Sequence, residues 1–333
     1  MSMITLKEEA VAKADRARSL LLLHCSGRGC RDHFDFVEVP TYSSLSLRIA
    51  EVALVGTTFT TNLLLIVAII SARKLSGSPF FKLVIILSAV FLVHCLCVLV
   101  LKLLPLFLSY TFVYQVEISL YIDIFSKYCT ILLIFVLSLY RFFMLTANRF
   151  GDILFTNWRF WLFPLGTFAL SAGATVAVVI VDKMSRKYVS WLGYADYSET
   201  STLLTAINYV SISISFVSIG LHAVIYLCMR KTRRKFLSNN RDGVSKAERT
   251  MLIQIALIAA VETLFLLLFI ILPQLDIAEG DLYLIVSLYN ILCSIPELLI
   301  PVFVLLLSKD LKQSLGRLIL PENSVTQHTK TIT

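Results

Sequence analysis

Six titratable side chains interrupt apolar stretches of the sequence that are otherwise almost free of charge. They are His94, Asp123, Lys127, His222, Glu262 and Glu297. Burying an ionisable group in hydrocarbon is costly, so such residues inside membrane spans usually contact one another, a ligand or an ion. Any chemistry of this chain is therefore expected at these positions.

Four of these residues are expected at one depth in the membrane. Counting about 1.5 Å of helical rise per residue from the nearest basic flank puts each about 18–21 Å from one membrane face. The four are His94, Lys127, Glu262 and Glu297. If they face inward, they line one polar cavity.

The pairing within this set stays open. Asp123 and Lys127 are four residues apart, so they can meet on one helical face and either neutralise each other or line a site. Glu262 and Glu297 are expected to be protonated or paired with Lys127 or His94, because burial disfavours a lone carboxylate. A purely structural contact between helices, a ligand site and an ion or proton path are all compatible with this pattern.

The elements that must position these groups are seven apolar stretches, each close to the roughly 20 residues that a membrane-spanning helix needs. Hydrophobic residues make up 57% of the chain and charged ones 16%, against about 25% charged residues in soluble domains. The sequence predicts an all-α polytopic membrane protein, a seven-transmembrane helix bundle. The expected spans are Val52–Ser71, Leu83–Leu101, Ile118–Leu145, Trp161–Val181, Leu203–Met229, Met251–Leu272 and Leu282–Leu307.

Basic residues predict the orientation. With the amino terminus outside, the cytoplasmic side receives the cluster from Arg230 to Arg249 and most other basic residues between spans, as the positive-inside rule requires. The net charge of +8 follows from this bias, so no nucleic-acid partner is expected.

Four regions are expected along the chain. Residues 1–48 form an extracellular and disordered tail, and residues 49–308 form the bundle. Residues 309–320 form an amphipathic cytoplasmic helix, because Leu311, Leu315 and Leu318 recur at helical spacing. Residues 321–333 form a cytoplasmic tail.

Asn62 lies in the first span, Tyr140-Arg141-Phe142 ends the third, and Pro301 lies in the seventh. These motifs resemble those of rhodopsin-class G-protein-coupled receptors. Other positions depart from the pattern of that class. Phe91 occupies the place of an aspartate in the second span, and the sixth has no Cys-Trp-x-Pro sequence.

A narrower resemblance covers residues 48–317. The segments that carry it are Ser78-Pro79-Phe80-Phe81-Lys82, Asn148-Arg149-Phe150, Asn157-Trp158 and Ser308-Lys309-Asp310-Leu311-Lys312. In these segments the chain is similar to the nematode serpentine chemoreceptors of the Srg-type superfamily, such as the Srv and Srx groups.

The resemblance implies a chemosensory receptor of the plasma membrane, including that of sensory cilia, which binds an unknown small molecule and signals through a heterotrimeric G protein. No enzymatic activity, cofactor or metal is expected. For the ligand we expect Asp123, Lys127 and Glu262, with His94 and Glu297 as deeper neighbours. For G-protein coupling we expect Arg141, Arg149, Arg233 and Arg234.

Other classes of membrane protein fit the sequence less well than a receptor. A proton-coupled secondary transporter is the main alternative, because the titratable layer could relay protons, although no repeat relates the first and last three spans. An opsin needs a lysine in the seventh span, and residues 282–307 contain none. A channel subunit of opposite orientation would place the basic cluster outside, against the charge bias.

Overall fold

A computed structural model describes residues 36–38, 45–108, 110–146, 148–155, 158–189, 193–198, 200, 202–237, 294–306 and 308–319, with isolated positions between 253 and 291. Five helices within this part are long and apolar enough to cross a membrane. They are α2 (Leu45–Ser71), α4 (Pro79–Leu108), α5 (Val113–Thr146), α7 (Arg159–Val181) and α8 (Thr202–Leu237).

These five helices match the first five predicted spans. A shorter apolar helix, Ser294–Leu306, corresponds to the second half of the predicted seventh span. The predicted sixth span and the first half of the seventh lie outside the described residues except for isolated helical positions. The all-α bundle predicted from composition is thus confirmed as the fold class.

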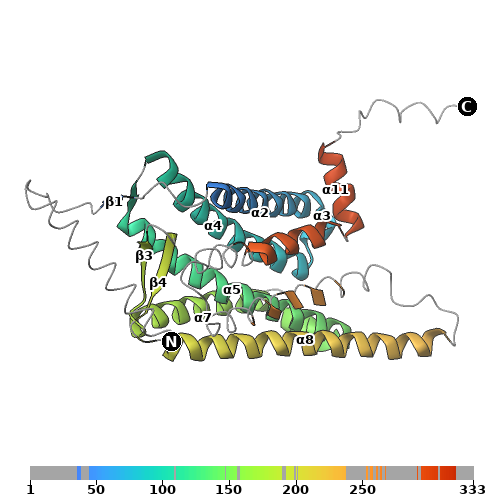
Figure 1. Cartoon of the computed structure of the whole chain (residues 1–333). Coiled ribbons are helices and arrows are strands. Elements are labelled where there is room, and N and C mark those ends of the chain that lie inside the picture. Colours follow the sequence, from blue (N-terminus) through green and yellow to red (C-terminus); the bar gives the residue numbers. More distant parts are fainter. Residues whose placement is uncertain are drawn as a thin grey trace, which may run out of the picture.

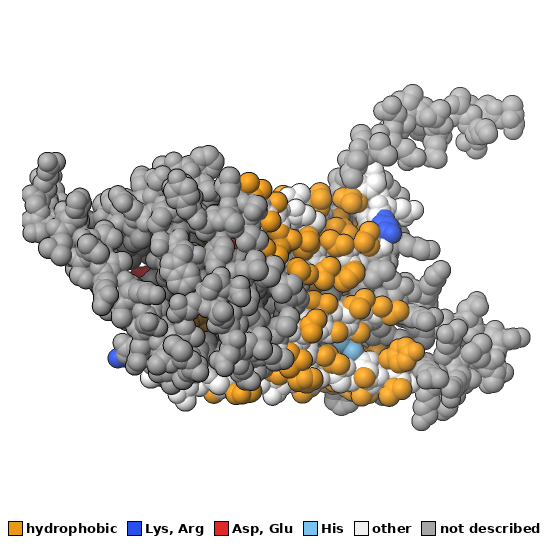
Figure 2. Space-filling model, in the orientation of Figure 1, with side chains coloured by type: hydrophobic (Ala, Val, Ile, Leu, Met, Phe, Trp, Pro, Cys, Tyr) orange, Lys and Arg blue, Asp and Glu red, His pale blue; other side chains and the backbone are white. Residues whose placement is uncertain are grey.

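Helix α5 lies at the centre of the bundle. It packs against α4, α7 and α8, while α2 packs on the other side of α4 (Figure 1). Large hydrophobic side chains on the outward surfaces of these helices stay exposed, including Leu165, Leu170, Ile180 and Tyr209. Figure 2 shows such side chains over most of the described surface on the face in view. A contiguous apolar surface of this kind suits contact with lipid.

Two small antiparallel sheets lie at the end of the bundle where α5 begins, which we call the hairpin end (Figure 1). Strand β1 (Phe36–Glu38) pairs with β2 (Tyr110–Phe112). Strands β3 (Ser185–Val189) and β4 (Gly193–Tyr197) form a hairpin in which Arg186 is opposite Asp196. The sequence analysis predicted neither sheet.

Helix α11 (Lys309–Ile319) lies at the opposite end, the α11 end, together with the short helices α3 (Arg73–Ser76) and α6 (Asn148–Phe155). The helix predicted after the seventh span is therefore present. Its Leu311 is fully buried in the protein core, and Ser314 Oγ donates a hydrogen bond to the Ala68 carbonyl of α2 at 3.2 Å. Part of its apolar face thus packs on the bundle, where the sequence predicted contact with the membrane surface.

The amino-terminal region also differs from the expectation. Residues 1–48 were expected to be disordered, yet β1 lies within them and α2 begins at Leu45, before the predicted start of the bundle. The pairing of β1 with β2 gives the backbone of residues 36–38 a hydrogen-bonding partner that no local sequence pattern shows. Cys25 and Cys30 lie outside the described residues.

The largest hydrophobic core cluster lies near the α11 end. It joins Leu65 and Ile69 of α2, Phe80 of α4, Tyr140 of α5 and Leu311 of α11. Aromatic contacts extend it, because Phe155 of α6 meets the Tyr140 ring edge-on at 5.0 Å and stacks on Phe163 at 4.6 Å. This end of the bundle is held mainly by apolar packing.

Candidate functional site

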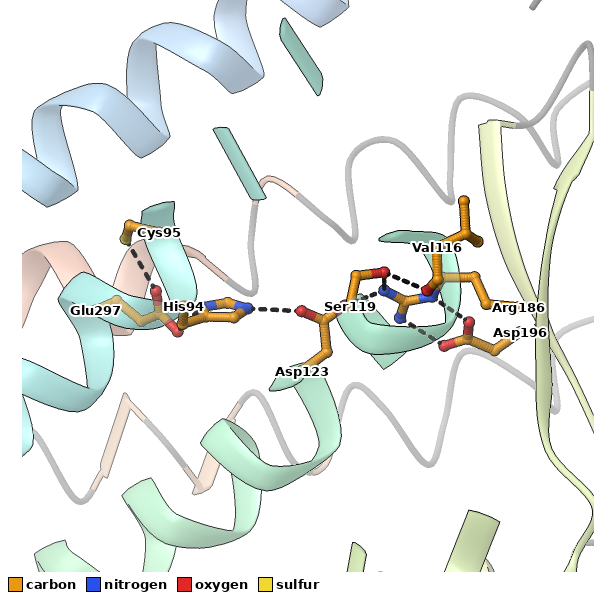
Figure 3. A network of polar contacts seen from close by, with 8 residues as sticks. All are labelled: His94, Cys95, Val116, Ser119, Asp123, Arg186, Asp196 and Glu297. Carbon is orange, nitrogen blue, oxygen red and sulfur yellow. Dashed lines mark hydrogen bonds and ion pairs between the residues drawn. The ribbon is translucent and has the colours of Figure 1, made fainter. Parts of the chain in front are cut away.

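A chain of polar contacts joins three helices of the bundle to the β3–β4 hairpin (Figure 3). At its centre, His94 of α4 lies between two carboxylates. Its Nε2 atom is 3.1 Å from Asp123 Oδ1 of α5, and its Nδ1 atom is 2.8 Å from Glu297 Oε1 of the Ser294–Leu306 helix. The second contact has ion-pair distance but a poor angle for a hydrogen bond. The imidazole therefore bridges α5 and the seventh span.

Arg186 of strand β3 extends this chain out of the bundle. One guanidinium nitrogen contacts Asp123 Oδ2, and the same Nη1 donates to Ser119 Oγ at 2.9 Å. The other side of the guanidinium pairs with Asp196 of β4 at 2.6 Å and 3.0 Å. The several N–H donors of the planar Arg186 guanidinium thus link the carboxylate of Asp196 on β4 to the carboxylate of Asp123 on α5, a geometry for which arginine is suited.

Charge keeps Arg186 in this position. Burial alone lowers the pKa of its guanidinium, but the hydrogen bonds and charges of Asp196 and Asp123 outweigh that effect and raise the pKa above its ordinary value. Its side chain is only 9% exposed. Arg186 is therefore a permanent cation held between two acids.

The hairpin that carries Arg186 is itself anchored by Asp182. This buried residue follows α7, and its carboxylate accepts hydrogen bonds from the backbone of Leu203 and Leu204 at 3.3 Å and 2.7 Å. Those amides lie in the first turn of α8, where backbone donors have no helical partner. Asp182, which is remote from α8 in the sequence, thus caps the first turn of α8. It links the end of α7, before the hairpin, to the start of α8, after the hairpin.

Glu297 is positioned by a proline four residues later. Pro301 has no N–H group, so the Glu297 carbonyl lacks the donor that a regular helix would provide. Asn62 Nδ2 of α2 donates to this carbonyl at 3.1 Å. The Glu297 side chain also accepts a contact from Cys95 Sγ at 3.7 Å. The glutamate therefore joins α2 and α4 to the seventh span.

The remaining predicted ligand residues lie nearby or outside the described residues. Lys127 is one turn along α5 from Asp123, and its Nζ donates to Asn208 Oδ1 of α8 at 3.3 Å. Glu262 lies outside the described residues. Of the alternatives left open for Glu297, the structure shows pairing with His94.

The residues predicted for coupling lie towards the α11 end. Arg141 is half-buried near the end of α5, and its guanidinium covers the Phe80 ring with 3.9 Å between the guanidinium carbon and the ring centroid. One turn earlier, Ser138 Oγ contacts His222 Nε2 of α8 at 3.0 Å. Arg149 belongs to α6, and Arg233 and Arg234 belong to the last part of α8.

Sequence reasoning missed Arg186 and Asp196 as members of the site. In the sequence both are charges of a polar connection between the fourth and fifth predicted spans. A signal was available, because Tyr188-Val189 and Tyr194 are residue types favoured in strands, and they lie on either side of a short connection that ends at Gly193, as in a hairpin. The reach of Arg186 back to Asp123 could not be read from that pattern.

The fold and the site define a polytopic helical membrane protein with a polar network inside its bundle. Residues 52–319 match the family described as serpentine type 7TM GPCR chemoreceptor Srv. This match covers most of the chain, so the protein belongs to the Srv family of seven-transmembrane chemoreceptors. No curated protein matches it.

Proposed function

We propose that this chain is a chemosensory receptor that binds a small molecule at the hairpin end of its bundle and signals through a heterotrimeric G protein. Membership in the Srv family supports the receptor function. The observation that carries the location of the site is the bridge of His94 between Asp123 and Glu297, which lie on different helices. In this proposal the receptor lies in the plasma membrane with its amino terminus outside and its carboxyl terminus in the cytoplasm, an orientation supported by the distribution of basic residues.

The proposed pocket contains His94, Asp123, Lys127, Glu262 and Glu297. A ligand group that competes for Asp123 or Glu297 would weaken the contacts that tie α4, α5 and the seventh span together. The ligand shifts the bundle between two arrangements only by the difference in its affinity for them. Exchange of partners in this network supplies such a difference, because the same carboxylates can bind either protein groups or the ligand.

The proposed coupling surface lies at the α11 end. Arg141, Arg149, Arg233 and Arg234 would contact the G protein or hold the inactive arrangement, with the inner ends of the fifth and sixth spans moving away from the third. Arg141 is the central member, because its guanidinium lies on Phe80 of α4 and so links two helices. If the Arg141 guanidinium moved away from the Phe80 ring, it could contact the G protein.

The test is a G-protein dissociation assay in cells that express the full chain at the surface, screened with mixed soluble and volatile small molecules. Arg141→Ala is expected to abolish a response that the wild type gives. Arg159→Ala is the matched control, since Arg159 is an exposed arginine at the same end whose Nη1 donates to the Ile153 carbonyl. An undiminished response of Arg141→Ala at equal surface expression would refute the coupling role.

A second variant pair tests the pocket. Asp123→Asn keeps the shape of the side chain but removes the charge that contacts His94 and Arg186. We expect the response to shift to at least tenfold higher ligand concentration, about 1.4 kcal/mol. Glu117→Gln, an exposed carboxylate on the same helix, should leave it unchanged. Equal responses of both variants would exclude Asp123 from the pocket.

A further inference from the structure

We infer that His94 is a proton-binding site, so that the proton itself is a chemical effector of this receptor. Both imidazole nitrogens face carboxylate oxygens, Nε2 towards Asp123 and Nδ1 towards Glu297. A neutral imidazole carries hydrogen on only one nitrogen and exposes a lone pair on the other. In the neutral form of His94, one ring nitrogen would therefore present its lone pair to a negatively charged carboxylate oxygen. The doubly protonated imidazolium removes this conflict, because its Nε2–H donates a hydrogen bond to Asp123 and its positive charge forms an ion pair with Glu297.

The other charged groups around His94 favour the same form. Arg186 contacts Asp123 and also pairs with Asp196. Counting Asp123, Glu297 and Asp196 against Arg186 leaves an excess of two negative charges within this network, which the proton on His94 reduces to one. The proton therefore relieves repulsion between carboxylates that the fold holds near one another.

The remaining titratable groups near His94 are few among the described residues. Cys95 contacts Glu297, and Cys97 lies on the same helix. Lys127 lies one turn further along α5. The charged residues of α2, Arg48 and Glu51, belong to its first two turns. Glu262 lies outside the described residues.

The bridge gives the proton a structural consequence. With His94 protonated, α4 is attached to α5 through Asp123 and to the seventh span through Glu297. Loss of the proton removes one donor and leaves one of these two attachments without its hydrogen. The arrangement of three helices thus depends on one proton on a side chain type that ordinarily titrates between about pH 5 and pH 8. The step from this proton to signalling rests on the proposed receptor function, whereas proton binding does not.

The experiment measures the thermal unfolding midpoint of the purified full chain in lipid nanodiscs from about pH 6 to about pH 9. This range begins near the ordinary histidine pKa and extends above it, because the two facing carboxylates favour the charged imidazole. The protonated bridge stabilises the folded bundle, so stability is highest at acidic pH and falls as His94 loses its proton. We expect the wild-type midpoint to fall by about 2–4 °C across this range. His94→Gln should lose this component of the pH dependence.

Two further variants keep the test specific. His222→Gln removes another buried histidine, which contacts Ser138 and neither carboxylate, and should keep the fall in stability above about pH 6.5 that His94 causes. Glu297→Gln keeps His94 but removes one facing carboxylate, and should move the transition to lower pH. It carries the test if His94→Gln does not fold. A wild-type profile in either His94→Gln or Glu297→Gln, or no pH dependence in the wild type, overturns the assignment.

This measurement needs neither a ligand nor a G protein. A chain that shows the His94-dependent transition but no G-protein response would retain the proton site and lose the proposed function. A chain that signals but shows no such transition would retain the function and lose the proton site.

Discussion

The two ends of this bundle are held together by different forces. At the α11 end, apolar and aromatic side chains such as Leu65, Phe80 and Phe155 are packed with almost no exposed surface. At the hairpin end, a smaller apolar cluster between α5 and α7 is accompanied by the charged contacts of His94, Asp123, Arg186 and Glu297. Apolar packing is non-directional and hard to exchange, whereas a carboxylate can change one donor for another.

This difference suggests a division of roles. Close-packed interiors do not deform continuously, so a change at one end is passed on as a shift of whole helices. At the hairpin end, a ligand or a proton can replace one partner of a charged side chain. At the α11 end, the helices are packed together near the proposed coupling residue Arg141. The predictions below test whether the two ends can be perturbed separately.

The largest effect is expected from Phe155→Ala at the α11 end. Phe155 is 3% exposed and contacts the rings of Tyr140 and Phe163. Removing it leaves a cavity and should lower the free energy of unfolding by about 3–5 kcal/mol. Denaturant or thermal unfolding in nanodiscs measures the loss. Leu162→Ala is the control, because Leu162 is 55% exposed on α7. Comparable losses of unfolding free energy in both variants would show that this cluster stabilises the bundle no more than exposed side chains do.

A smaller effect is expected from uncoupling the hairpin. A double-mutant cycle with Arg186→Met and Asp196→Asn should give a coupling energy of about 1–2 kcal/mol, because the pair has two hydrogen bonds but Asp196 is partly exposed. The unfolding free energies of the four chains provide the value. The same cycle between Arg186 and Glu117 should give almost none. Equal coupling in both cycles would mean that Arg186 acts through general charge only.

The smallest effect is expected from Asn62→Ala. It removes the donor to the Glu297 carbonyl, which Pro301 leaves without a helical partner, and should cost about 0.5–1.5 kcal/mol of unfolding free energy, the net value of one neutral hydrogen bond. Thr60→Ala is the control, since its exposed hydroxyl donates only within its own helix. A neutral Asn62→Ala would show that the carbonyl finds another donor. The pH response of His94 should then also stay unchanged.

The local pattern of the sequence was enough to predict most of the bundle. Long, mostly apolar stretches identified the five described spans within a few residues at most ends, because a helix in lipid satisfies its own backbone hydrogen bonds and presents mainly apolar side chains. Helix α5 is longer than its predicted span, since its polar first turns such as Tyr114-Gln115 carry no apolar signal. Helix α11 was found from its leucine spacing, but its contact with α2 was not.

The candidate site was predicted in part. His94, Asp123 and Glu297 stood out because a charge in an apolar stretch is conspicuous, and helical rise put His94 and Glu297 at one depth. Arg186 and Asp196 did not stand out, because charges are ordinary in a polar loop. Nothing in the local sequence relates residue 186 to residue 123.

The sequence by itself determined that this chain crosses the membrane as helices, and which few side chains carry charge into it, because both follow from hydrophobicity along a single segment. Only the tertiary structure decided which of these groups meet. The partners of His94 depend on how three helices and a hairpin pack, and that packing is set by contacts between residues far apart in the chain.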